Sequence, residues 1–258
     1  MSRPARPVAN VLGVSIDLVR LPDVLERIQA AITRDERQTL AYIHASGLCL
    51  AREQPWLREF LNACDLAYCD GMGVMLGARL LGERIPERLV LTDWSQSLVE
   101  LAAQEGYTLY FLGNPPGAAE RAARVMEARY PGVRILGCQD GFFDKSVRSP
   151  QNLAVIANIN QAKPDILLVG FGMPAQERWL AENRAVLETS VVLTAGALFE
   201  YLAGDLRRGP RWMTEHYLEW LARILISPRR YWKRYLRDNL RFLYFILRQK
   251  FAQKSGSG

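Results

Sequence analysis

An aspartate beside two glycines is the first feature of this sequence that suggests chemistry. Residues 69–94 read CDGMGVMLGARLLGERIPERLVLTDW, in which Asp70 precedes Gly71 and Gly73. An ionised carboxylate can take a proton from an attacking hydroxyl group, and the arginines that follow can each donate two hydrogen bonds to a phosphate. The stretch therefore predicts one edge of a site for a negatively charged substrate. A lone aspartate before a glycine is more often a turn or helix-cap residue, and Arg84 and Arg88 alone would indicate a solvated face.

The elements around this stretch predict an α/β fold. Short apolar runs bounded by Gly, Pro or Asp alternate with helical patterns such as PPGAAERAARVMEARYPG. The strand candidates are NVLGVSIDLV, TLAYIHA, DLAYC, YTLYFLG, VRILGC, PDILLVGFG and SVVLTAGA. Continuous apolar strands that alternate with helices indicate a mostly parallel, Rossmann-like sheet flanked by helices.

Polar clusters follow several of these strands. They are YIHAS, YCDGMG, FLGNPPG, GFGMPAQE and TAGALFEYLAGDLRRGP. Ligands of such folds bind beyond the carboxyl ends of the strands, so we expect these clusters to meet at one edge of the sheet. FLGNPPG opens a helix, and we expect its backbone N–H groups to be free for an anion.

Several other chemistries lack their motifs. Gly170-Phe171-Gly172 lacks the third glycine of a dinucleotide fingerprint, and there is no phosphate-loop lysine, Asp-x-Asp or Gly-x-Ser-x-Gly. The four cysteines form no Cys-x-x-Cys pair, which favours buried thiols over a zinc site. The sequence shows neither an apolar run long enough for a membrane-spanning helix nor a signal peptide, so we expect a cytoplasmic protein.

The positive charge is concentrated near the end of the chain. The net charge is +6, yet residues 223–254 hold ten Lys or Arg and one acid, which leaves 23 basic against 26 acidic residues elsewhere. We therefore divide the chain into a core domain over residues 1–208 and a basic amphipathic helical appendage over 209–254. Residues 255–258 read SGSG and are assigned to a disordered end or a cloning scar.

The appendage has a helical pattern with two faces. An apolar face recurs at steps of three and four, at Trp232, Leu236, Leu240, Leu243 and Leu247. Basic residues cluster about the opposite side, at Arg230, Lys233, Arg234, Arg237, Arg241 and Arg248. The pattern predicts a helix that lies in an anionic membrane interface. The alternatives are a helix packed on the core with a solvated basic face, and a nucleic-acid-binding tail, for which no recognised motif is present.

Five blocks, in order, resemble the WecG/TagA/CpsF family of glycosyltransferases. The blocks are DGMGVMLGARLLG, ERLVLTDW, GFGMPAQE, AGALFEYLAGDLRRGP and YLEWLARILISPRRYWKRYL. The resemblance extends from about Leu12 to about Tyr235. It implies an inverting, metal-independent enzyme without a cofactor, which transfers a sugar from a UDP-sugar to an undecaprenyl-diphosphate-linked saccharide for cell-surface polysaccharide synthesis.

The same resemblance implies partners and residue roles. The enzyme is expected to work as a peripheral protein on the inner face of the cell membrane, with a homo-oligomer left open and no nucleic-acid partner. Asp70 is implied as the general base. The implied substrate-binding residues are His44, Arg88, Thr92, Asp93, Gly113, Gly172, Gln176, Glu177, Glu200, Arg207, Arg223 and Arg230.

Five positions depart from the family pattern. His44 replaces Asn, Leu91 replaces Gly, Ala175 replaces Lys, Glu200 replaces Asp and Gly209 replaces Ala. These departures leave the donor sugar open, and the activity is expected to be that of a hexosyltransferase or to be N-acetylmannosaminyltransferase-like. They also keep a non-catalytic homologue that binds a sugar nucleotide or a lipid as the alternative.

Overall fold

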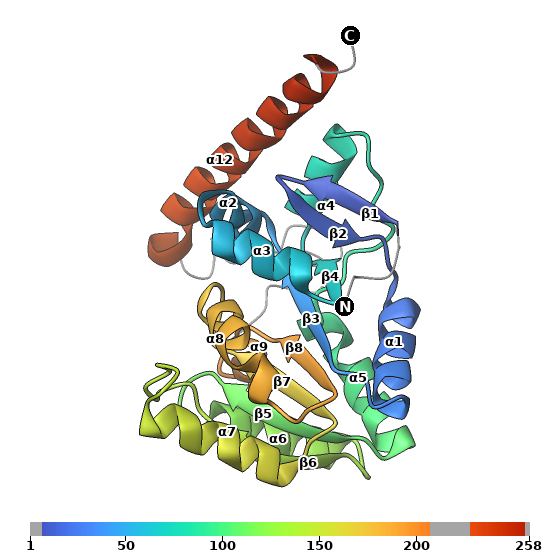
Figure 1. Cartoon of the computed structure of the whole chain (residues 1–258), viewed down its shortest axis with the longest axis vertical. Coiled ribbons are helices and arrows are strands. Elements are labelled where there is room, and N and C mark those ends of the chain that lie inside the picture. The colour runs from blue at the N-terminus through green and yellow to red at the C-terminus, as the bar shows by residue number, and fades with distance from the viewer. Residues whose placement is uncertain (1–6, 207–227, 256–258) are drawn as a thin grey trace.

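Six parallel strands form the central sheet, which confirms the predicted α/β fold (Figure 1). The computed structural model describes residues 7–206 and 228–255, and the side chains of 237–253 within the last helix. The strands are β3 (Gln38–Ile43), β4 (Leu66–Cys69), β5 (Thr108–Gly113), β6 (Arg134–Gln139), β7 (Ile166–Gly170) and β8 (Val191–Thr194). Their order is β4-β3-β8-β7-β5-β6, and every neighbouring pair is parallel. All six carboxyl ends therefore lie at one edge.

Helices cover both faces of the sheet, which is why β3, β4, β5, β7 and β8 are buried along their whole length, whereas the edge strand β6 is only partly buried. One face packs against α1 (Leu21–Thr33), α5 (Leu91–Glu105), α6 (Ala118–Arg129) and α9 (Leu198–Leu202). The other packs against α2 (Ala45–Glu53), α3 (Pro55–Ala63), α4 (Met72–Leu80), α7 (Pro150–Ala162) and α8 (Ala175–Asn183). In β3, for example, Leu40 and Tyr42 point to the first face, and Ala41 and Ile43 to the second. A short 3-10 helix, η1 (Arg184–Val186), follows α8.

The first strand candidate lies outside the main sheet. NVLGVSIDLV contributes to an antiparallel hairpin of β1 (Val8–Val11) and β2 (Val14–Asp17). Leu12 and Gly13 turn the chain between them with positive φ angles of 55° and 84°. Such φ values suit a tight turn, and glycine adopts them without steric cost. The apolar side of the hairpin packs with α2, α3 and α4 in one core cluster.

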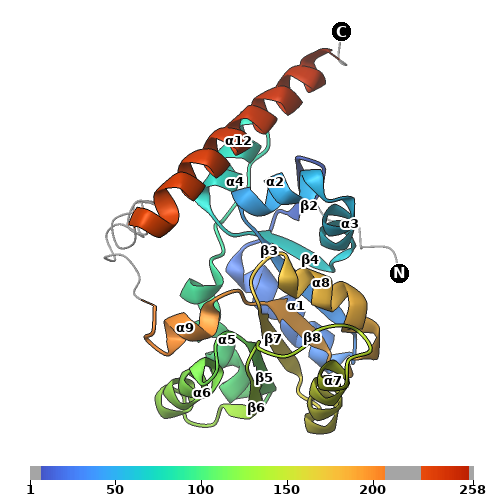
Figure 2. The ribbon, with the colours of Figure 1, turned by 90° about the vertical axis from the view of Figure 1, so that its left-hand side faces the viewer.

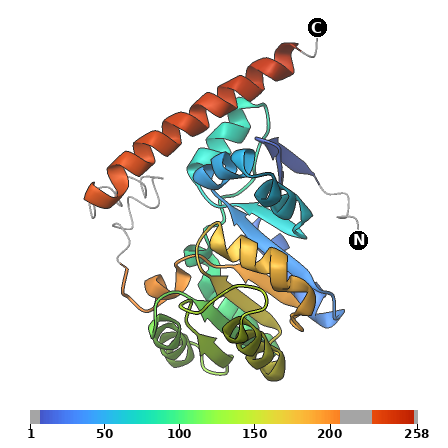
Figure 3. The same ribbon diagram turned by 60° about the vertical axis from the view of Figure 1, so that its left-hand side comes forward.

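The helix α12 (Pro228–Ser255) lies against α2 and α4 (Figures 2 and 3). Phe242 and Ile246 are buried in the same core cluster as the hairpin. Gly77 of α4 makes room for them, because a Cβ there would lie 2.7 Å from the Phe242 ring. The side chain of Gln249 accepts from the Leu12 N–H at 2.8 Å and donates to the Asn10 carbonyl at 3.0 Å. One face of α12 is therefore part of the protein core.

Candidate active site

Asp70 lies at the carboxyl end of β4, where the chain turns into α4. Its N–H donates to the Ile43 carbonyl at 2.8 Å, which ties it to the end of β3. Gly71 follows with φ 131° and caps α4, a backbone conformation that L side chains rarely adopt. The partly exposed Asp70 carboxylate is thus held at the strand edge beside the start of a helix.

Arg88 and Asp93 lie beside this strand end. Leu89 donates its N–H to the Cys69 carbonyl at 2.8 Å, which brings the 83–90 connection against β4. Arg88 is 3.7 Å from Asp93 in the first turn of α5, and the two side chains are 15% and 44% exposed. Burial raises the pKa of the Cys69 thiol to about 12, with the Asp70 charge raising and the Arg88 charge lowering it. Asp70 follows Cys69 directly and Arg88 precedes Leu89, so both charged residues lie at this strand end.

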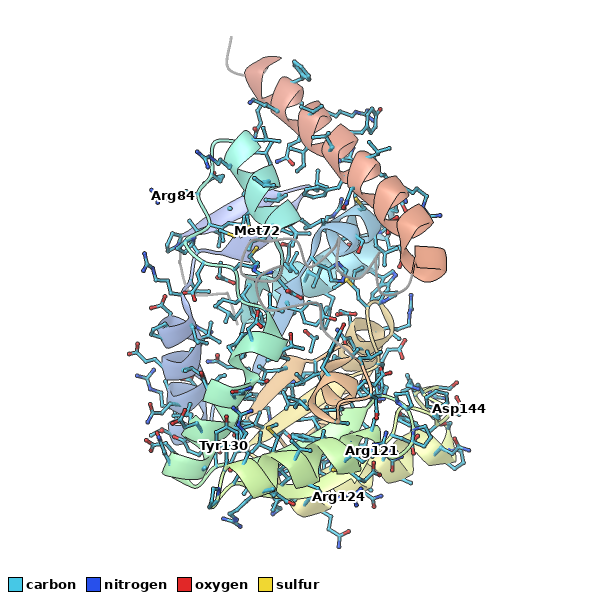
Figure 4. The ribbon with its side chains drawn as sticks, turned by 180° about the vertical axis from the view of Figure 1, so that it is seen from behind. Met72, Arg84, Arg121, Arg124, Tyr130 and Asp144 are labelled. Atoms are coloured by element: carbon cyan, nitrogen blue, oxygen red, sulfur yellow. The ribbon has the colours of Figure 1, made fainter. Side chains whose placement is uncertain are left out.

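Thr92 joins this group and Arg84 does not. Thr92 lies next to Asp93 in the first turn of α5 and is partly buried. Arg84 is exposed and points away from the body of the protein (Figure 4), as expected for a solvated face. Met72, labelled in the same view, marks the start of α4.

His44 caps the helix that follows the neighbouring strand β3. Its Nδ1 accepts from the Gly47 N–H at 2.9 Å and lies 3.0 Å from the Ser46 hydroxyl. A ring nitrogen that accepts from a backbone N–H carries no proton, so neutral His44 has its proton on Nε2. Asparagine is also a preferred N-cap, so the helix cap survives the departure from the family pattern.

Gln176 connects three segments at the same edge of the sheet. Its Oε1 accepts from the N–H groups of Gly172 at 3.2 Å and Gly196 at 3.0 Å. Its Nε2 donates to the Tyr42 hydroxyl at 3.1 Å and to Glu177 Oε1 at 2.8 Å. The side chain is fully buried and all its hydrogen-bonding capacity is used, which favours a positioning role over direct contact with substrate.

Glu177 is fully buried beside Gln176. Its Oε2 has no hydrogen-bond partner within the described part of the chain. Burial raises the pKa of this carboxyl to about 7, and the bond from Gln176 opposes that rise. Glu177 is therefore poised to change charge near neutral pH.

Asn114, which the sequence analysis did not single out, joins the ends of β5, β7 and β8. Its Nδ2 donates to the carbonyls of Gly170 at 2.6 Å and Gly196 at 2.7 Å, and its Oδ1 accepts from the Glu200 N–H at 3.1 Å. Gly113 before it allows this junction, since a Cβ there would collide with the Gly170 carbonyl. Gly113 thus permits close packing of two strand ends.

The expectation that FLGNPPG offers free N–H groups is wrong at several of its positions. The Asn114 N–H donates to the Gly170 carbonyl at 2.8 Å. Pro115 and Pro116 have no N–H, and the Ala118 N–H bonds to the Pro115 carbonyl at 3.0 Å. The sequence itself shows that the two prolines lack N–H groups, but it could not reveal the bond of Asn114, because its partner lies on another strand.

A cavity of about 360 Å³ opens beside Asn114, at the carboxyl ends of β5, β7 and β8. The connection after β5 leads to α6 on one face of the sheet, and the connection after β7 leads to α8 on the other. Crevices at such a reversal are the usual ligand sites of open α/β sheets. The residues that line the cavity include Asn114, Phe142, Lys145, Gly172, Ala175 and Glu200. Of these, Gly172 and Glu200 are among the predicted binding residues.

The cavity and Asp70 occupy different parts of one edge. Strands β3 and β8 lie between β4 and β7, a separation of about 14 Å at the usual strand spacing of about 4.8 Å. His44 lies between them, after β3. The structure therefore brings Asp70, Arg88, Thr92 and Asp93 together at one end, and Gly172, Gln176, Glu177 and Glu200 at the other.

Three predicted binding residues are not placed. Arg207 and Arg223 lie outside the described residues, and Arg230 lies in α12 at a position whose side chain is not described. Across 7–206 and 228–255, no three His, Cys, Asp or Glu side chains form a group that could hold a metal ion. Within the same ranges, no helix combines the length and apolarity needed to cross a bilayer.

Comparison with known proteins assigns the family. Residues 9–256 match the glycosyl transferase WecG/TagA/CpsF family, and the chain belongs to it. Two curated relatives are similar in sequence to this chain. Each is named N-acetylglucosaminyldiphosphoundecaprenol N-acetyl-beta-D-mannosaminyltransferase. The relative from Bacillus subtilis (strain 168) is 27% identical over 178 residues, which cover 69% of this chain and 67% of the relative. The relative from Bacillus spizizenii (strain ATCC 23059 / NRRL B-14472 / W23) is 27% identical over 186 residues, covering 72% and 70%.

Proposed function

We propose that this protein is an inverting glycosyltransferase that moves a sugar from a UDP-sugar to an undecaprenyl-diphosphate-linked saccharide. The observation that carries the proposal is the shared sheet edge, with an aspartate at one end and a ligand-sized cavity at the topological reversal. The names of the two relatives support a lipid-diphosphate-linked acceptor that ends in N-acetylglucosamine, and a donor of the N-acetylmannosamine type. The product serves polysaccharide synthesis at the cell surface.

Asp70 acts as the general base in this proposal. Its carboxylate takes the proton of the acceptor hydroxyl while the hydroxyl oxygen bonds to the anomeric carbon of the donor. The bond from that carbon to the diphosphate oxygen breaks on the opposite side, and its electron pair leaves with UDP. Attack opposite the leaving group inverts the anomeric configuration.

The donor occupies the other end of the edge. The cavity beside Asn114 takes the nucleoside, and the Glu200 carboxylate suits the ribose hydroxyls as a hydrogen-bond acceptor. The diphosphate begins in this cavity and extends toward Asp70, where Arg88 stabilises the departing charge by bidentate hydrogen bonds. No metal or other cofactor takes part in this scheme.

The outward face of α12 supports a membrane location for the reaction. Leu240, Leu243, Tyr244, Leu247 and Phe251 are 60%, 43%, 58%, 40% and 64% exposed. At 100° per residue they lie opposite Phe242 and Ile246, which pack on the core. The side of α12 opposite the leucines therefore packs on the core. It is not the solvated basic face that the sequence pattern indicated.

The basic side chains of residues 237–253 border this apolar face instead. Arg237 and Arg248 are exposed on one flank and Lys250 is partly exposed on the other, while Arg241 forms an ion pair with Glu53 of α2. An exposed apolar stripe with basic borders fits the boundary between lipid tails and anionic headgroups. We infer that this face places the enzyme at the inner surface of the membrane, where a lipid-linked acceptor is found.

A donor screen tests the proposed function. The intact protein is incubated with an undecaprenyl-diphosphate-linked N-acetylglucosamine and one UDP-sugar at a time, and both UDP release and product linkage are measured. We expect acceptor-dependent UDP release with a UDP-N-acetylhexosamine, and a product of inverted anomeric configuration. Donor binding without transfer from any donor would favour the non-catalytic homologue instead.

A further inference from the structure

The cavity wall contains a cation that neither the motifs nor the family assignment pointed to. Lys145 belongs to the 140–149 segment, which connects β6 to α7 and includes the labelled Asp144 (Figure 4). Among the described residues that line the cavity, Lys145 has the only cationic side chain and Glu200 the only anionic one. Lys145 and Glu200 come from different segments of the chain. The cavity therefore offers one positively charged hydrogen-bond donor and one negatively charged acceptor.

Aromatic rings and carbonyl groups hold the Lys145 ammonium in place. Its Nζ lies 4.6 Å from the centre of the Phe143 ring and 4.7 Å from that of Phe171. It donates to the Gly141 carbonyl, and to the Phe143 carbonyl at 3.4 Å. An ammonium group has three N–H donors, so these two bonds leave one for a ligand.

Within the described residues, no carboxylate forms an ion pair with this ammonium group. The nearby acids are used locally, since Asp140 accepts from the Phe142 N–H at 2.7 Å and Asp144 from the Ser146 N–H at 2.9 Å. Burial lowers the pKa of Lys145, and the charges of Asp140 and Asp144 oppose that change. A partly desolvated cation without a bound carboxylate interacts strongly with an incoming anion.

The first turn of α8 adds positive potential to the same cavity. Ala175 is the first residue of α8, is exposed, and lines the cavity together with Lys145. The start of a helix attracts anions through its dipole and its N–H groups. The family pattern described above has a lysine where this chain has Ala175, and the cation that lines the cavity here comes from the 140–149 segment.

We propose that Lys145 binds the anionic diphosphate of a nucleoside diphosphate in this cavity, in place of a cation at position 175. The inference rests on the proposed function, because it assigns the ligand of that same site. Its particular content is that the cation for the diphosphate comes from the 140–149 segment, whereas the family pattern has a lysine at the start of α8.

Calorimetric titration of the intact protein with UDP and with uridine tests the inference. Lys145→Met keeps an apolar stem between the two rings and removes the charge, and we expect it to bind UDP about 10-fold more weakly or worse. Uridine binding should be unchanged, because uridine lacks the diphosphate. Lys145→Arg should retain UDP affinity, and Lys145→Met combined with Ala175→Lys should recover most of it. Arg148→Met, an exposed cation on the same segment, is the matched control and should bind UDP as the wild type does.

The outcomes separate this inference from the proposed function. A wild-type protein that binds neither UDP nor uridine would overturn both the role of Lys145 and the proposed function. Normal UDP binding by the wild type and equal binding by Lys145→Met would overturn the role of Lys145 alone. An equal loss of UDP and uridine binding in Lys145→Met would also overturn the role of Lys145. That pattern indicates that Lys145 only holds the two aromatic rings in place.

Discussion

At the scale of single residues, the position of Asp70 leads to a prediction about turnover. Asp70→Asn keeps the size of the side chain and its place after β4 but removes the proton acceptor. We expect turnover to fall about 100-fold or more, the usual effect of losing a general base, while UDP affinity stays unchanged. Steady-state assays with lipid-linked acceptor and calorimetry with UDP measure the two quantities. Turnover close to that of the wild type would exclude Asp70 as the base.

Glu177 leads to a prediction about stability and pH. Burial raises the pKa of its carboxyl to about 7, whereas an unfolded chain would titrate it near 4.3. Between these values the folded state holds a proton that the unfolded state has lost, so the free energy of unfolding falls as pH rises. Glu177→Gln removes this titration. Relative to the wild type it should gain stability between pH 5 and pH 8, by up to about 3 kcal/mol.

Urea unfolding at the two pH values measures this gain. Glu182→Gln is the control, because Glu182 lies one helical turn further along α8 in a solvent-exposed pair with Arg178. Its stability relative to the wild type should be the same at both pH values. If the Glu177→Gln protein showed no pH-dependent difference either, Glu177 would already be ionised in the folded protein.

The residues of the site differ in how far the sequence could reveal them. Asp70, Arg88 and Asp93 lie within 24 positions of one another, and their spacing already suggested a site. Asn114 and Lys145 gave no such signal. Asn114 bonds to Gly170 and Gly196, which are 56 and 82 positions away, and Lys145 reaches the cavity only because β6 is paired with β5.

At the scale of elements, the six parallel strands were predictable because each contains a short apolar run. The hairpin was not, since NVLGVSIDLV reads as one strand, and only the positive φ at Leu12 and Gly13 divides it. For α12 the helical period was visible, but the residues that bind the core are determined by the space above Gly77. Tertiary packing determines where such a strand divides and which face of a helix binds the core. A local sequence pattern does not contain that information.

The packing of α12 can be tested with two adjacent positions. Phe242 is 6% exposed and Leu243 is 43% exposed. Phe242→Ala should weaken the attachment of α12 by about 3 kcal/mol or more, because it leaves a cavity against α2 and α4. Hydrogen exchange of the backbone amides of residues 237–253 should then become faster. Leu243→Ala should leave that exchange unchanged, and equal effects of the two changes would contradict the packing.

At the scale of the whole molecule, α12 connects the proposed membrane-binding face to the proposed site. It packs on α2 and α4, and these helices begin at His44 and next to Asp70. A membrane that holds the outer side of α12 would therefore fix the orientation of the two helices that start at the acceptor end. Because Phe242 and Ile246 belong to the core, removing the helix would also expose that core, so surface substitutions are a cleaner test than truncation.

The last prediction concerns the exposed leucines of α12. Replacing Leu240, Leu243 and Leu247 together with serine leaves Phe242, Ile246 and Gln249 in place, so the fold and UDP affinity should be retained. Binding to anionic vesicles should fall about 10-fold or more, since three apolar side chains no longer enter the interface. Each basic residue near an anionic leaflet contributes about 1 kcal/mol of attraction, so the remaining binding should weaken further with salt. Sedimentation with phosphatidylglycerol vesicles, and with neutral phosphatidylcholine vesicles as the control, measures both effects.

Turnover on an acceptor embedded in vesicles should fall in parallel, whereas turnover on a short-chain, water-soluble acceptor should not. If the triple variant bound vesicles as the wild type does, the outward face of α12 would have another role, and the enzyme would reach its lipid substrate through a different surface.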